Sequence, residues 1–190
     1  MGVLEKLLSM YMGLVYRDFE EELVRVIVVE DIGPIYIPEG VIELTKGSEY
    51  NLPRWIAVEL YRRGYVEFKD KPVDLEKLAK IAYSEESSRK GIEFSKTPQY
   101  FYHIVGYEID GLYERLERER DTRLLLDIQK YEDYLLRIGK ARVKKITQLI
   151  PIEIPQEVYM CLSEEERILY RMLREILVGW LKTLRIEKGD

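Results

Sequence analysis

The sequence predicts a mainly α protein, in which a small N-terminal α/β domain, rich in β-strands, precedes an all-helical domain. Apolar residues recur at steps of three and four over the first twenty residues and again after residue 74, which is the period of amphipathic helices. Between these segments, short β-branched runs are separated by Gly and Pro turn signals. A charged break at 69–72 separates the two patterns, and we therefore expect domains at 1–70 and 71–190.

Composition narrows the classes of function. Of the 190 residues, 46% are hydrophobic, which is enough to build a core and excludes a wholly disordered chain. The 30 basic and 35 acidic residues leave a net charge of −5, which disfavours strongly electrostatic binding to duplex DNA. A single cysteine, Cys161, and a single histidine, His103, exclude an internal disulfide and a zinc finger. We expect a cytoplasmic protein with no membrane-spanning segment.

The N-terminal domain is expected to combine two helices with a small antiparallel meander. The first twenty residues should form an amphipathic helix that docks on the rest of the protein. Asn51 is a candidate N-cap, and Pro53 should lie in the first turn of a helix that ends at Gly64. Strands are expected at 23–29, 35–37, 41–45 and 65–68. So small a unit should depend on other surfaces for its stability.

The C-terminal domain is expected to begin with two shorter helices. Asp74 can cap the first of them. The segment 84–96 is polar and should form a loop. Pro98 should then open the second helix, since proline is tolerated in a first turn.

The two longest predicted helices carry apolar stripes suited to contacts with other proteins. One covers 121–150, and the last helix follows a proline-containing connector and opens at a capping box formed by Ser163 and Glu166. Fifteen tyrosines, which favour interfaces as well as cores, also indicate a subunit of an assembly. The candidate subunit-interface residues are Ile128, Tyr131, Leu135, Ile138, Ile146, Leu169, Ile176 and Trp180.

No catalytic constellation is found in the sequence. It has no glycine-rich phosphate loop, no nucleophile-elbow motif and no zinc-protease motif. His103 lies in an aromatic helical run, where packing or hydrogen bonding is a commoner role than general-base catalysis. The acidic clusters 20–22 and 164–166 lie at predicted helix ends, where acids favour an N-terminus or face water. We therefore predict no enzymatic activity, no catalytic residue and no bound cofactor or metal.

A run of cations marks the second half of the long helix. Arg137, Lys140, Arg142, Lys144 and Lys145 follow one another with no acidic residue between them. Two interpretations are open. The face is either solvated or salt-bridged near a helix C-terminus, or it contacts a nucleic-acid backbone or an acidic partner. A nucleic-acid-binding regulator that uses this face is the alternative to an assembly subunit.

Three stretches of the sequence, in this order, carry a family resemblance. The run from Gly47 to Ala57 contains Leu52, Pro53, Trp55 and Ala57, and it resembles the leucine-proline-leucine-tryptophan-leucine-alanine signature of GINS complex subunits. The stretches 94–102 and 121–140 fit the same family, so the resemblance covers nearly the whole chain. One departure is Arg54, where the family often has an apolar residue.

The resemblance implies a fold, a role and a set of partners. Because the β-rich unit precedes the helices, the chain resembles the archaeal "two-three" type, with a small B domain before a helical A domain. Membership would imply a non-catalytic scaffold that joins a second GINS subunit type in a 2:2 heterotetramer. It would also imply association with the MCM replicative helicase and a RecJ-like protein, activating DNA unwinding at the replication fork, with at most weak DNA contact.

Overall fold

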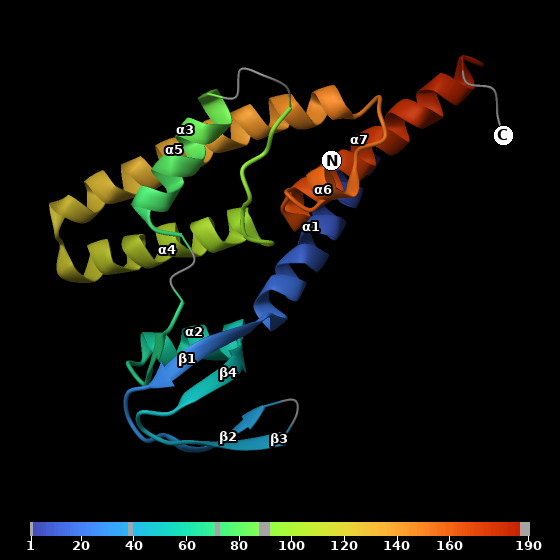
Figure 1. Cartoon of the computed structure of the whole chain (residues 1–190). Helices are drawn as coiled ribbons and strands as arrows, with labels where there is room; N and C mark the ends of the chain where they lie inside the picture. Colours follow the sequence, from blue (N-terminus) through green and yellow to red (C-terminus); the bar gives the residue numbers. More distant parts are fainter. Residues whose placement is uncertain (1, 38–39, 71–72, 88–91, 187–190) are drawn as a thin grey trace. The chain divides into compact units, whose positions relative to one another are not determined.

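Figure 1 shows a computed structural model of the chain, which describes residues 2–37, 40–70, 73–87 and 92–186. The chain divides into two compact units, Met1–Pro72 and Val73–Asp190, close to the boundary that we expected after residue 70. The described strands all lie in the first unit, and helices predominate in the chain as a whole. The protein is thus mainly α with a small N-terminal sheet region.

Helix α1 (Val3–Glu21) opens the first unit and confirms the amphipathic helix expected there. Burial is restricted to its C-terminal part, where Val15 and Phe19 are buried. Apolar side chains of the earlier turns, including Leu4 and Leu8, are exposed. The predicted docking of the stripe is therefore observed for the last turns of the helix and not for the first.

Short antiparallel strands confirm the expected β-rich region, although they form two sheets rather than a single meander. Strand β1 (Leu23–Val28) is the centre of a sheet with the order β4-β1-β5, in which β4 is Glu49–Pro53 and β5 is Val66–Phe68. Strands β2 (Gly33–Ile37) and β3 (Gly40–Leu44) form a separate hairpin. The core of the unit is made by Val26, Val28, Leu44, Leu52, Ile56, Ala57 and Val66.

The segment before α2 (Arg54–Arg62) is a strand and not the helix start that we predicted from Asn51. Leu52 lies opposite Val24 of β1 and is buried in the core. Pairing with β1 therefore outweighs the local capping signal, because it satisfies backbone groups and buries a leucine together. Pro53 has no N–H to donate, and it fits at the end of an edge strand, where it becomes the N-cap of α2.

Arg54, the departure from the family pattern, is accounted for by its contacts with α1. Its guanidinium carbon lies 4.3 Å from the centroid of the Phe19 ring. The side chain also forms an ion pair with Glu22, and the Arg54 N–H donates to the Glu22 carbonyl at 2.9 Å. Arginine at this position therefore joins the start of α2 to the end of α1.

The second unit is organised around α5 (Thr122–Leu149), which packs against both α3 (Leu75–Ser87) and α4 (Phe101–Glu119). The long helix predicted over 121–150 is confirmed. A single helical turn, α6 (Gln156–Tyr159), lies within the proline-containing connector, and α7 (Glu164–Thr183) follows it.

Local capping signals identify the starts of α3 and α7. Asp74 Oδ1 accepts the Lys77 N–H at 2.8 Å, and Glu166 Oε2 accepts the Ser163 N–H at 3.0 Å. Both predicted helix starts are thus confirmed. The predicted loop over 84–96 is only partly right, because α3 continues through Ser87 and irregular chain covers 92–98. Helix α4 begins three residues after Pro98.

Candidate protein-interaction surfaces

Arg142 is the centre of a buried ionic network in the second unit. Its Nε and Nη2 donate to the two carboxylate oxygens of Glu166 at 2.6 and 2.7 Å, and its Nη1 donates to Glu85 Oε1 at 2.7 Å. The same guanidinium also donates to the carbonyls of Ser95 at 3.0 Å and Cys161 at 2.8 Å. One side chain therefore joins α5 to α3, to α7 and to the segments that precede α4 and α7.

Charge compensation offsets the effect of burial on Arg142. Burial alone would lower the pKa of Arg142, but the carboxylates of Glu166 and Glu85 raise it above its ordinary value. The Tyr102 hydroxyl donates to Glu166 Oε1 at 2.8 Å, and burial together with that carboxylate raises the pKa of Tyr102. A fully paired network of this kind favours one arrangement of the helices.

Of the two acids of the network, Glu166 was expected only as the capping-box residue of α7, and Glu85 was not singled out, although it left a signal in the sequence. Glu85 follows Leu78, Ile81 and Ala82 at helical spacing, and all four side chains are buried on α3. An acid within an apolar stripe requires a buried partner, because an unpaired buried charge is very costly. That partner is fifty-seven positions away, and its identity could not be read from local sequence.

Two residues of the predicted cationic face belong to this network instead. Arg142 is 0% exposed and Lys145 is 9% exposed. The Lys145 ammonium donates to Glu85 Oε2 at 2.6 Å and to the Glu93 carbonyl at 2.7 Å. Of the two interpretations left open for this face, the salt-bridged one holds for Arg142 and Lys145, because their charges are paired with Glu166 and Glu85 inside the chain.

The other three cations remain accessible to different degrees. Arg137 is half-buried and pairs with Glu86 of α3, its Nη2 lying 2.6 Å from Glu86 Oε2. Lys140 and Lys144 are exposed, and within the described part of the chain neither ammonium group forms an ion pair or hydrogen bond, although the Lys144 carbonyl accepts a hydrogen bond from the Thr147 hydroxyl at 2.8 Å. The predicted cationic face is thus reduced to these two lysines and part of Arg137.

His103 takes part in a pair between α4 and α7. Its Nδ1 lies 2.6 Å from Glu165 Oε1, and its backbone N–H donates to the same oxygen at 3.2 Å. Burial alone would raise the pKa of Glu165, but hydrogen bonds, of which that from His103 is the largest, hold the pKa below 4.5. The structure confirms a hydrogen-bonding role for this histidine.

Most of the apolar interface candidates on α5 belong to the chain's own core. Ile128, Ile138 and Ile146 are fully buried, and Tyr131 is nearly so. The Tyr131 hydroxyl reaches the Val73 carbonyl at 3.5 Å, and burial raises the pKa of this tyrosine to about 12. The expectation that these four residues form a subunit interface is therefore wrong, since α3 and α4 already pack against α5. The fifth candidate on this helix, Leu135, is half-buried.

The C-terminal half of α7, in contrast to α5, carries exposed interface candidates. Ile176 is 47% exposed, Trp180 57% and Leu184 48%. Spacings of four residues place these three side chains along one side of the helix. The candidate nearest the start of the helix, Leu169, is half-buried. We call Ile176, Trp180 and Leu184 the α7 stripe, and it is an exposed apolar surface of the kind that protein partners cover.

A second exposed apolar surface lies on the first turns of α1. Its side chains alternate at steps of three and four, so that they share one side of the helix. They are Leu4, Leu7, Leu8, Tyr11 and Leu14. This surface belongs to the first unit.

The signature-like run of the first unit is mostly internal. Leu52, Pro53 and Ala57 are buried, where they help to join β4 and α2 to the sheet. Trp55 is 47% exposed on the opposite side of α2. The run therefore serves the fold of the β-rich unit through three residues and leaves one aromatic side chain available.

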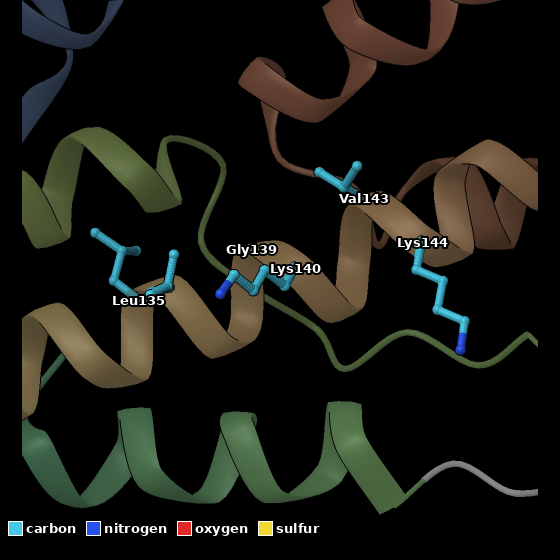
Figure 2. A pocket seen from close by; sticks show the side chains of 6 residues that line it. Leu135, Gly139, Lys140, Val143 and Lys144 are labelled. Atoms are coloured by element: carbon cyan, nitrogen blue, oxygen red, sulfur yellow. The ribbon is translucent and has the colours of Figure 1, made fainter.

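A shallow hollow of about 660 Å³ lies on the outer side of α5. Figure 2 shows five of its residues following one another along the helix. The hollow is lined by Leu135, Leu136, Gly139, Lys140, Val143 and Lys144. Leu135, Lys140 and Lys144 were among the residues expected at interfaces, but no hollow was expected between them.

Comparisons with other proteins do not place the chain in a family. No protein-family description matches it, and no curated protein matches it. Among the described residues, no group of His, Cys, Asp or Glu side chains is arranged to hold a metal ion. Within those same ranges, none of the helices has both the length and the apolar character required to cross a bilayer.

Proposed function

We propose that this protein is a non-catalytic subunit of a GINS-type complex. As such, it joins a second GINS subunit type and associates with the MCM helicase and a RecJ-like protein. Its contribution to unwinding is a binding effect, in which added contacts favour the active arrangement of the motor. The sequence resemblance supports this proposal, as does the order of a small β-rich unit followed by a helical unit.

The α7 stripe is the observation on which the proposal mainly depends. Burial of an Ile, Leu or aromatic side chain contributes roughly 1.5–3 kcal/mol each, so an uncovered stripe favours association. Trp180 at its centre is the type of residue that most often dominates the energy of an interface. The polar residue Arg171 lies on the same helix outside the stripe and provides a matched control position.

The alternative, a nucleic-acid-binding regulator, is weakened by the burial of Arg142 and Lys145. Affinity for a phosphate backbone grows with the number of phosphates neutralised, and two free lysines provide few such contacts. A monomer that binds DNA with affinity falling steeply in salt would favour this alternative over the assembly.

The proposal is tested by light scattering on the purified chain, alone and after co-expression with a second GINS subunit type. We expect a defined hetero-oligomer, and we expect retention of the MCM helicase in a pull-down with that oligomer. The double variant Ile176→Asp, Trp180→Asp should remain folded and lose assembly, since it places charges on the stripe. Arg171→Asp introduces the same side chain on the same helix and should assemble normally.

Two results would contradict the proposal. One is a wild-type chain that stays monomeric at micromolar concentration in the presence of the second subunit. The other is a double variant that assembles as well as the wild type, which would show that the α7 stripe is not the interface.

A further inference from the structure

The hollow on α5 combines an apolar floor with a basic rim. Leu136 is 55% exposed and Val143 is 43% exposed, and both line the hollow. Seven residues separate them, which places them about 10 Å apart along one side of the helix. A partner helix presents its own apolar side chains at the same interval, so the floor has the spacing of a helix-packing seam.

Gly139 lies between these two side chains and keeps the floor low. A Cβ atom added there would meet no atom closer than 3.8 Å, at the Tyr102 ring. The chain's own packing therefore does not require glycine at this position, even though glycine weakens a helix interior. Without a Cβ, this position offers room for the backbone of another segment to approach.

The rim of the hollow carries two lysines that pair with no acid of the described residues. Lys140 and Lys144 are one helical turn apart, a spacing at which like charges repel. The neighbouring Arg142 and Lys145 are each matched by acids of this chain. The ammonium groups of the rim lysines are therefore available to pair with carboxylates of a partner.

We propose that this hollow binds an acidic amphipathic helix of a partner protein. The partner's apolar side chains pack on Leu136, Gly139 and Val143, and its carboxylates pair with Lys140 and Lys144. The apolar floor favours a helix over a nucleic acid, because a phosphate backbone gains nothing from contact with leucine and valine. This surface is separate from the α7 stripe, and the inference goes beyond the assembly proposed above.

The test uses the full chain and two synthetic, fluorescein-labelled helical peptides. Both peptides carry a leucine stripe, flanked by glutamates in the first and by lysines at the same positions in the second. Binding is followed by fluorescence anisotropy at low and high salt. We expect the glutamate peptide to bind, the lysine peptide not to bind, and the affinity to fall as salt is added.

Charge reversal at the rim provides the decisive comparison. The pair Lys140→Glu, Lys144→Glu should weaken binding of the glutamate peptide about tenfold or more and allow the lysine peptide to bind. The pair Arg123→Glu, Lys130→Glu changes the net charge equally on the same helix, outside the hollow, and should leave both affinities unchanged. Leu136→Ser removes part of the apolar floor and should weaken binding of the glutamate peptide as well. Circular dichroism checks that each variant is folded.

Three results would overturn the inference. The glutamate peptide could fail to bind the wild type, or the two charge-reversed double variants could weaken binding of this peptide equally. A single-stranded dT oligonucleotide could bind in its place and be lost on reversal of Lys140 and Lys144, which would make the hollow a nucleic-acid contact. The α7 variants should keep peptide binding, so failure here is distinguishable from failure of the proposed assembly.

Discussion

Arg142 and Lys144 lie two positions apart on α5, yet they occupy opposite environments. Arg142 is buried and bonded to two carboxylates, whereas Lys144 is exposed at the edge of the hollow. Two steps along an α-helix rotate a side chain by about 200°, so neighbouring cations necessarily face different surroundings. A run of like charges in the sequence therefore need not form a charged surface, because acids of the same chain can pair with the cations on one side of the helix.

The same division appears along α7. Glu165 and Glu166, in its first turn, are buried and hold His103 and Arg142. Ile176 and Trp180, in its second half, are exposed. On α7, therefore, the buried acids are paired within the chain, and two apolar side chains of the second half are left uncovered.

The largest expected loss of stability comes from removing Arg142 from the buried ionic network. Arg142→Ala leaves Glu85 and Glu166 buried without their main partner, and it should lower the free energy of unfolding by about 3–5 kcal/mol. Lys144→Ala, two positions away, should change it by less than about 0.5 kcal/mol. Urea denaturation followed by circular dichroism measures both, and equal losses would show that the network does not stabilise the unit.

The contrast between buried and exposed positions of α5 can also be tested with two apolar residues, Ile138 and Leu136. Ile138→Ala removes a fully buried side chain from α5 and should cost about 2–5 kcal/mol, because the transfer energy is lost and a cavity is left. Leu136→Ala, on the exposed side, should cost less than about 1 kcal/mol. The same urea titrations apply, and a larger loss for Leu136 than for Ile138 would contradict the assigned burial.

Lys145 allows a smaller test at the edge of the network. Lys145→Met keeps the length of the side chain but removes its bond to Glu85, which retains Arg142 as a partner. The free energy of unfolding should fall by about 1–3 kcal/mol. Lys144→Met is the matched control, and no loss is expected from it because Lys144 is exposed.

The pH dependence of stability should expose the His103–Glu165 pair. The pKa of Glu165 is lowered in the folded chain, so its contribution is fully present above the ordinary value of 4.5 and is lost as pH falls through the folded pKa. Glu165→Gln should therefore reduce the melting temperature most near pH 7 and by less at about pH 3. Thermal unfolding across this range measures the difference, and a constant gap between the two proteins would rule out this contribution.

Features with a local physical signal could be predicted from the sequence. The helical period and the caps at Asp74 and Ser163 were sufficient to locate helices in the second unit, because capping satisfies backbone groups within a few residues. Features with distant partners could not. Leu52 is in a strand because β1 is available to pair with it, and α3 continues to Ser87 with Glu85 bonded to α5.

The amino-acid sequence alone determined that this chain is mainly helical, that a small β-rich unit comes first, and that its helices are amphipathic. These properties follow from periodicity and capping, which act over one or two turns. Only the tertiary structure decided which cations are neutralised, which apolar stripes are core, and where a hollow remains on α5. Burial and ion pairing depend on segments that meet in space, and in this protein the decisive partners of Arg142 are twenty-four and fifty-seven positions away.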